Sequence, residues 1–259
     1  MSGMHFERMA AEYADARPPY PPSLYELLKA AGVIGAGTRV LEVGAGSGLA
    51  TRELVRSGSD VVAVEPGRGL AGLLRRDVPG AAVLLARLED AELSPGSFDS
   101  VVAATSMHWI DLSTALPKLH TALRAEGWLA VWRHRFGDER AYTEFRRRVQ
   151  RIVAARPPGA SERRTDDRPT VDELAAGGWF EPVRSEQWRW SIELDSERVR
   201  RLFRTFSDWN DAEVEAVGRA ADDLGGVVTE HYQSVLHLLR RASGSPPVVP
   251  GRVTVCGPG

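Results

Sequence analysis

The first half of the chain alternates short apolar runs with longer amphipathic stretches. The apolar runs predict strands at 39–43, 60–65, 81–87, 98–105 and 128–134. The amphipathic stretches predict helices at 23–31, 48–58, 68–77 and 112–124. Strands that are apolar on both faces and alternate with helices are typical of a parallel sheet covered on both sides. Right-handed crossovers then predict a doubly wound α/β fold.

The second half of the chain changes character. Helical patterns occur at 139–156, 171–180, 195–210 and 211–225. Alternation over 183–194 predicts another strand, whereas 227–241 fits either a strand or a helix. We favour a strand there, because it follows Gly225 and Gly226 and would pair antiparallel with 183–194. The expected fold is therefore a mostly parallel, seven-stranded, doubly wound sheet with a helical cap.

Composition and charge exclude several classes of protein. The 259 residues carry a formal net charge of -2, so we expect no nucleic-acid or anionic-membrane partner. One cysteine, Cys256, leaves no disulfide framework and no cysteine-rich metal site. The N-terminal residues lack the apolar core of a signal peptide, and no apolar run is long enough to span a bilayer. A cytoplasmic protein without a metal is expected.

The sequence GAGSG at residues 44–48 follows the first predicted strand and precedes a helix. Its glycines permit positive φ angles and carry no Cβ, so a ligand can lie against the main chain. Ligands of open parallel sheets bind at this carboxyl edge. A dinucleotide-binding loop needs its third glycine where Leu49 stands, and no P-loop lysine is present. A tight turn without a ligand is the alternative.

Two carboxylates stand beside this loop. Glu42 lies near the end of the first strand, where a buried carboxylate is costly unless a cation pairs with it. Glu65 ends the second strand, where carboxylates accept hydrogen bonds from a ribose diol; an exposed strand-end acid is the alternative. Together they favour a positively charged nucleoside without phosphates. S-adenosylmethionine has the required amine, sulfonium and ribose diol.

Several segments resemble class I S-adenosylmethionine-dependent methyltransferases, above all the small-molecule branch that includes trans-aconitate methyltransferase-like enzymes. The segments are YADARPPYP (13–21), VLEVGAGSGLAT (40–51), VVAVEPG (61–67), LEDAELSPGSFDSVVAATSMHWID (88–111), LRAEGWLAVW (123–132), RTFSDWN (204–210) and LGGVV (224–228). They extend over about residues 5–241. The glycine motif is specific for the superfamily, whereas no segment names the acceptor.

This resemblance implies a Rossmann-like methyltransferase fold and a set of cofactor contacts. The contacts implied for the methionine end of the cofactor are Glu42, Gly44, Ala45, Gly46, Thr105 and Ser106. Those implied for the nucleoside are Glu65 at the ribose, Pro66 against the adenine, and Leu88 and Glu89 near the adenine, where Arg87 replaces the acid usual in the family. Those implied for an N-terminal lid are Tyr13, Arg17 and Tyr20, with Arg17 pairing the cofactor carboxylate and an aromatic ring facing the sulfonium. The aromatics could instead anchor a helix.

The acceptor is expected after the fourth strand and under the cap. His108 should face the methyl group and take a proton from the acceptor, unless it only packs at the strand end. The expected acceptor contacts are Trp109, Thr205, Phe206, Ser207 and Trp209. The arginine-rich stretch at 146–151 is expected to be a solvated helix face, with attraction of an anionic acceptor as the alternative.

The expected function is methyl transfer from S-adenosylmethionine to a small molecule, with S-adenosylhomocysteine as the second product. On the resemblance we favour O-methylation of a carboxylate or hydroxyl group. An NAD(P)-dependent oxidoreductase, a non-methylating enzyme of the same fold and a partner-binding subunit are the alternatives. The expected regions are lid helices at 1–36, a cofactor-binding core at 37–135, acceptor-side helices and the last two strands at 136–241, and a flexible tail at 242–259.

Overall fold

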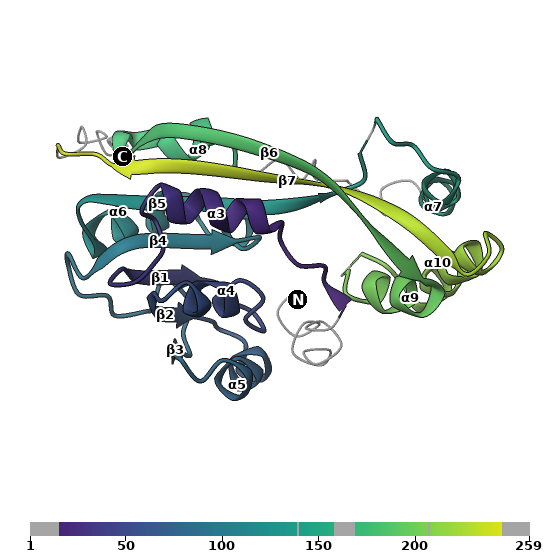
Figure 1. Ribbon diagram of the computed structural model, residues 1–259, viewed down its shortest axis with the longest axis horizontal. Coiled ribbons are helices and arrows are strands. Elements are labelled where there is room, and N and C mark those ends of the chain that lie inside the picture. The colour runs from purple at the N-terminus through teal and green to yellow at the C-terminus, as the bar shows by residue number, and fades with distance from the viewer. Residues whose placement is uncertain (1–15, 139, 158–168, 207, 245–259) are drawn as a thin grey trace, which may run out of the picture.

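A seven-stranded sheet runs through the computed structural model, which describes residues 16–138, 140–157, 169–206 and 208–244. The strands, shown in Figure 1, are β1 (Arg39–Val43), β2 (Asp60–Val64), β3 (Ala81–Leu84), β4 (Phe98–Ala104), β5 (Leu123–Phe136), β6 (Phe180–Asp195) and β7 (Val227–Arg241). Their order is β3-β2-β1-β4-β5-β7-β6. The first five are parallel, and β7 runs antiparallel to both β5 and β6. The predicted mostly parallel, seven-stranded sheet is confirmed.

Helices cover both faces of this sheet. The helices of the core are α3 (Pro22–Ala30), α4 (Thr51–Arg56), α5 (Arg68–Asp77), α6 (Leu112–Ala122) and α8 (Val171–Ala175). Alternate residues of β1 face opposite sides, as the strand pleat requires. Val40 packs in a cluster with residues of α3 and α4, whereas Leu41 packs with residues of α6 and α8. The sheet is thus buried on both sides, which explains why its strands are almost wholly apolar.

Element boundaries differ from the expected ones where a turn or a strand contact intervenes. β5 begins at Leu123 rather than 128, because Leu123 pairs with Phe98 before a bulge that ends at Trp128. The helix expected from 139 begins at Glu144, because the Thr143 side chain accepts a hydrogen bond from the Arg146 amide and caps it. The segment at 227–241 is a strand paired with β6, as favoured.

A second group of helices forms a cap at one end of the molecule. The cap consists of α7 (Glu144–Ala154), α9 (Ser196–Arg204) and α10 (Asp211–Asp222), which share a hydrophobic cluster. It is mounted on β5, β6 and β7, which have 14, 16 and 15 residues against 5 for β1. Figure 1 shows these long strands running past the carboxyl ends of β1 and β4, so that the cap lies beyond the glycine loop.

Candidate active site

The glycine loop after β1 has the geometry of a ligand-binding turn. Gly44, Gly46 and Gly48 have φ angles of 67°, 60° and 91°. A Cβ atom on Gly44 would lie 2.5 Å from Cβ of Ser106, and one on Gly48 would lie 2.6 Å from Cδ1 of Leu74. A Cβ on Gly46 would meet nothing within 4 Å. Packing therefore requires two of the glycines, while the third leaves bare backbone beside open space.

Hydrogen bonds to β2 hold this loop in place. The amides of Gly44 and Ala45 donate to the carbonyl oxygen of Val64 at 2.8 and 3.2 Å. The Glu65 carboxylate accepts from the Gly46 amide and from the Gly67 amide, each at 2.8 Å. These contacts fix Glu65 at the carboxyl end of β2, next to the open side of Gly46. Each carboxylate oxygen can accept more than one hydrogen bond, so a ribose diol can still be bound there.

Glu42 lies in the middle of the sheet and is 1% exposed. Neither of its carboxylate oxygens has a hydrogen-bond partner among the described residues. Burial raises the pKa of Glu42 to about 8; the neighbouring Thr51 hydroxyl, which does not reach hydrogen-bond geometry, opposes this shift, and the nearby Glu65 adds slightly to it. An orphaned carboxylate beside a loop with room for a ligand fits the ammonium group of a bound amino acid. The residues present therefore fit S-adenosylmethionine.

The end of β4 carries a strained residue next to the loop. Thr105 has a φ angle of 57°, which is unusual for a β-branched residue. Its amide donates to the Trp132 carbonyl at 2.7 Å, and its hydroxyl lies 2.7 Å from the Tyr20 hydroxyl. Ser106, which is buried, donates its hydroxyl to the Val43 carbonyl and touches Gly44 from the side. Thr105 and Ser106 thus stand beside the loop, with their hydroxyls bonded within the fold. Their contact with the methionine end of the cofactor stays a prediction.

The chain that enters α3 crosses between the core and the cap. Tyr20 is buried and stacks on His134 at a centroid distance of 4.2 Å. The His134 ring lies 3.3 Å from the Pro18 carbonyl, and burial lowers its pKa to about 3, so it is neutral. Arg17 donates to the Thr205 carbonyl at 3.3 Å and lies 4.6 Å from the Phe206 ring centroid. Arg17 and Tyr20 therefore tie this segment to the cap and to the end of β4.

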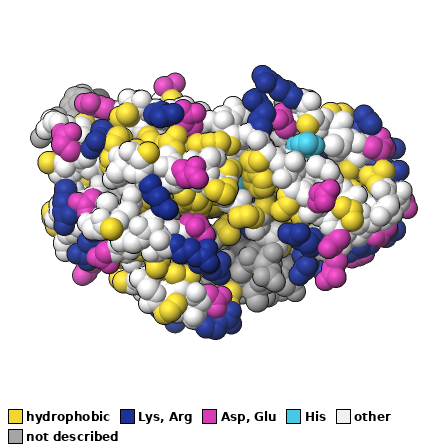
Figure 2. All heavy atoms as spheres, in the orientation of Figure 1, with side chains coloured by type: hydrophobic (Ala, Val, Ile, Leu, Met, Phe, Trp, Pro, Cys, Tyr) yellow, Lys and Arg dark blue, Asp and Glu magenta, His cyan; other side chains and the backbone are white. Residues whose placement is uncertain are grey.

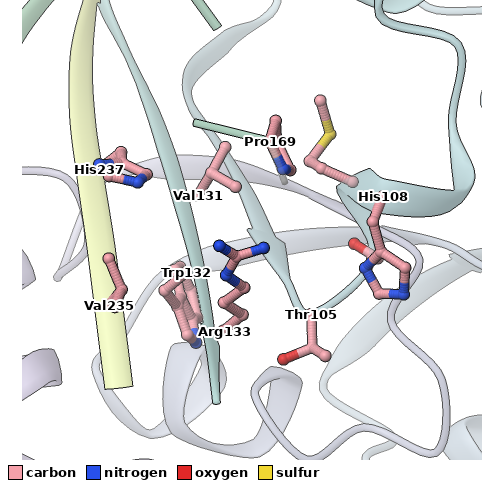
Figure 3. Close-up of a pocket in the computed structure, with 10 residues that line it drawn as sticks. Thr105, His108, Val131, Trp132, Arg133, Pro169, Val235 and His237 are labelled. Carbon is pink, nitrogen blue, oxygen red and sulfur yellow. The ribbon is translucent and has the colours of Figure 1, made fainter. Parts of the chain in front are cut away.

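A hollow opens on the other side of Thr105. Its lining includes Thr105 itself, His108, Arg133 and His237, and it is open to solvent. Figure 3 shows Arg133 amid the labelled residues, between His237 on β7 and His108 after β4. His108 belongs to the short helix η1 (Met107–Trp109) and contacts Trp109, which is 55% exposed. His108 and Trp109 thus stand at the expected edge of the sheet.

Arg133 was not predicted as a site residue from the sequence. Arg133 lies on β5 and is 8% exposed. Burial lowers the pKa of the His237 imidazole, and the positive charge of Arg133 lowers it further. A signal was available, because an arginine inside the apolar strand WLAVWRH is rarely buried without a role.

The three predicted adenine contacts differ in their exposure and in their partners. Pro66 is exposed directly after Glu65. Leu88 is 3% exposed, with its side chain in the hydrophobic core, so that an interaction through its amide is the one left to it. Glu89 forms an ion pair with Arg87 at 3.3 Å. These roles stay predictions.

Of the predicted acceptor contacts in the cap, Phe206 faces the core, whereas Thr205 and Trp209 are held within the cap itself. Phe206 faces the segment that carries Arg17 and packs on Phe136 at 4.6 Å. Thr205 is 1% exposed and donates its hydroxyl to the Leu202 carbonyl, whereas Trp209 packs inside the cap. Tyr13 and Ser207 lie outside the described residues.

The arginine-rich helix differs from its expected role at one position. Arg147 and Arg151 are 50% and 70% exposed, as expected of a solvated face. The prediction is wrong for Arg146, which is 16% exposed and forms an ion pair with the buried Glu230. The partner lies 84 positions away, so the local sequence carried no sign of it.

The described residues hold neither a metal site nor a membrane-spanning helix. No group of histidine, cysteine, aspartate and glutamate side chains there has the arrangement of a metal site. No described helix combines the length and apolar character needed to cross a membrane.

Comparison with known proteins agrees with this geometry. Residues 41–131 match the family model described as a methyltransferase domain. An uncharacterised methyltransferase of Mycobacterium tuberculosis is 38% identical over 138 residues, which are 53% of this chain and 54% of the relative. The chain thus spans about half the length of this relative. An uncharacterised methyltransferase of Schizosaccharomyces pombe is 24% identical over 88% of both chains.

Solved structures show the same fold. A candidate type II methyltransferase from Anaeromyxobacter dehalogenans has a TM-score of 0.57 and 22% identity, over 86% of this chain and 97% of its own. A candidate methyltransferase from Bacillus halodurans also has a TM-score of 0.57, with 13% identity, over 85% of this chain and 100% of its own. The matched segment contains Glu42, the glycine loop, Glu65 and Thr105. Residues 41–131 are thus similar to a methyltransferase domain, and the chain shares the fold of these solved methyltransferases.

Proposed function

We propose that this protein transfers a methyl group from S-adenosylmethionine to an oxygen atom of a small molecule. The observation that carries the proposal is the orphaned Glu42 carboxylate beside the open backbone of Gly46, with Glu65 at the next strand end. These groups match the ammonium, the methionine chain and the ribose of the cofactor in turn. Glu42 favours an ammonium group over the phosphates of a dinucleotide, because a phosphate would oppose its ionisation whereas a cation would pair with it.

The residues of the site would bind and orient rather than take part in covalent chemistry. When bound, S-adenosylmethionine supplies a methyl group from a positively charged sulfur, and that sulfur keeps the electron pair of the broken S–CH3 bond, which gives S-adenosylhomocysteine. Glu42 holds the ammonium, and Glu65 holds the ribose hydroxyls. Gly46 lets the ligand approach the main chain. Alignment with the acceptor and exclusion of water then supply most of the rate enhancement.

The acceptor oxygen is proposed to lie between the end of β4 and the cap. A lone pair of that oxygen forms the new C–O bond, and a hydroxyl acceptor then has one proton to lose. His108 is half-buried at this edge and is the proposed recipient of that proton. A carboxylate acceptor has no proton to lose and needs no base.

Replacement of His108 tests this role. With a hydroxyl acceptor, His108→Ala should slow transfer by roughly 10²–10⁴-fold, because it removes the general base. The affinity for S-adenosylhomocysteine should not change. A near-normal rate in single-turnover assays would leave His108 only a packing role.

The experiment that tests the proposed function is calorimetric titration of S-adenosylhomocysteine into the wild type and Glu65→Ala. The wild type should bind one equivalent, and the variant should bind about ten- to a hundredfold more weakly, because it loses hydrogen bonds to a charged acceptor. Glu181→Ala, at an exposed acid on the edge strand β6, is the matched control for loss of a carboxylate. Equal affinities of wild type and Glu65→Ala would remove Glu65 from the site.

A further inference from the structure

The hollow beside Thr105 lies where β5 continues past the end of β4. β4 pairs with β5 as far as Ala104, which lies opposite Trp132. At Thr105 the chain turns out of the strand with a φ angle of 57° and continues into η1. Arg133 is therefore the first residue of β5 beyond its pairing with β4. The hollow, which Arg133 lines, opens at this point.

The lining of this hollow combines a cation with apolar walls. Figure 3 shows the Arg133 guanidinium in the space between His237 and His108. None of the described residues that line the hollow is an acid. The apolar lining residues are Met107, Val131, Trp132, Pro169 and Val235. A guanidinium among apolar walls is suited to bind an anionic group of a small molecule.

Burial makes this guanidinium a better ligand for an anion than an arginine on the surface. Arg133 is 8% exposed, whereas the side chain of Arg124, on the same strand, is 51% exposed. An ion pair shielded from water is stronger, because water competes less for either charge. A guanidinium has five N–H donors, so Arg133 can bind a carboxylate through two parallel hydrogen bonds and keep other contacts within the protein.

His237 supplies a second hydrogen-bonding group to the hollow. Its Nδ1 lies 2.8 Å from the Ser185 hydroxyl oxygen. Burial and the positive charge of Arg133 lower the pKa of the imidazole, so the ring is neutral at pH 7. When the Ser185 hydroxyl donates to Nδ1, the ring proton lies on Nε2, which can donate to a ligand oxygen. His237 therefore adds a donor to the hollow without adding a second full charge.

The attraction for an anion is local to the hollow. The chain has a formal net charge of -2. Figure 2 shows Lys and Arg side chains interspersed with Asp and Glu on one face of the molecule. Long-range attraction of anions is weak for such a protein. One guanidinium in one hollow matches a single carboxylate.

We propose that this hollow binds a carboxylate at a non-reacting position of the methyl acceptor, with Arg133 as its main ligand and His237 as a second donor. The acceptor role rests on the proposed function. His108, the proposed base, lines the same hollow. A molecule whose carboxylate binds Arg133 therefore needs only a short body to bring a hydroxyl group to His108. The class of acceptor inferred is a compact hydroxy acid.

Two probes of the same shape, 4-hydroxybenzoate and 4-hydroxybenzamide, test this inference at pH 7 on the full chain loaded with S-adenosylhomocysteine. In calorimetric or ligand-detected NMR titrations, the acid should bind about ten- to a hundredfold tighter than the amide, because its hydrogen bonds to Arg133 are charge-assisted. Arg133→Met should abolish this preference. Arg133→Lys, which keeps the charge without the planar fork, should retain part of it. Arg124→Met, at the exposed arginine on the same strand, is the matched control and should retain all of it.

Far-UV circular dichroism establishes that each variant is folded, and Arg133→Lys decides the test if Arg133→Met does not fold. Equal binding of acid and amide by the wild type, no binding of the acid, or an undiminished preference in either folded Arg133 variant overturns the inference. Titrations without S-adenosylhomocysteine separate the two proposals. Binding of the acid through Arg133 without any binding of S-adenosylhomocysteine contradicts the proposed function alone. Binding of S-adenosylhomocysteine without discrimination between acid and amide contradicts this inference alone.

Discussion

Glu42 is a buried acid whose burial is not offset by any hydrogen bond from the described residues. Its carboxyl group is 1% exposed, its oxygens lack partners in the described residues, and its pKa is raised to about 8. The folded state therefore holds a proton on Glu42 at pH values where the unfolded chain has lost it. The free energy of unfolding should fall as pH rises from about 4.5 to about 8, by at most about 1.4 kcal/mol per pH unit, and level off above that range.

The variant Glu42→Gln should not show this loss. Without ligand it should become more stable than the wild type as pH rises, with the difference growing up to about pH 8, because glutamine does not titrate. Urea denaturation at pH 5, 6, 7 and 8 measures the difference, and Glu92→Gln at an exposed site is the control. A difference that stays constant with pH would mean that Glu42 is ionised in the empty site.

Single residues also show where sequence reasoning reaches its limit. Glu42 and Glu65 were identified from the sequence, because each has a fixed place relative to an apolar strand and a glycine loop. Arg146 and Glu230 were not, because a buried ion pair between α7 and β7 exists only after the cap has folded onto the sheet. The positive φ angle of Thr105 could not be predicted from the sequence either. Its amide is bonded to Trp132 and its hydroxyl to Tyr20, and both partners are distant in sequence.

At the scale of elements, the loop after β1 and the end of β4 fit each other closely. Gly44→Ala should destabilise the protein by about 2–4 kcal/mol, because alanine is strained at a φ of 67° and its Cβ would lie 2.5 Å from that of Ser106. In a Ser106→Gly background the steric part should disappear, leaving a cost of about 1–2 kcal/mol. Equal costs in both backgrounds, measured by urea denaturation, would mean that the two elements do not touch.

The strands were predictable to different degrees. β1 and β2 have apolar runs and matched the prediction within one residue, because both faces are buried. β7 was ambiguous, since only one of its faces is fully buried and the alternation of VVTEHYQSVLHLLRR is interrupted near its end. Pairing with β5 and β6 settles it as a strand, and such pairing is a property of the sheet rather than of the segment.

At the scale of the whole molecule, three hydrophobic clusters flank the sheet and a fourth lies in the cap. Ala45 of the glycine loop packs in one cluster of the sheet, and Leu41 and Val43, which flank Glu42, pack in another, while Phe206 packs against the cap cluster. The resemblance to a family predicted both parts, but not how the chain near Arg17 and Tyr20 joins them. The division of the chain at residues 36, 135 and 241 stays a prediction.

The central claim is that the loop between Glu42 and Glu65 binds S-adenosylmethionine. It is tested most directly by titrating the wild-type protein with S-adenosylhomocysteine and, separately, with NADH at pH 8. We expect one equivalent of S-adenosylhomocysteine to bind, and no saturable heat with NADH. Saturable binding of NADH together with no binding of S-adenosylhomocysteine would contradict the account.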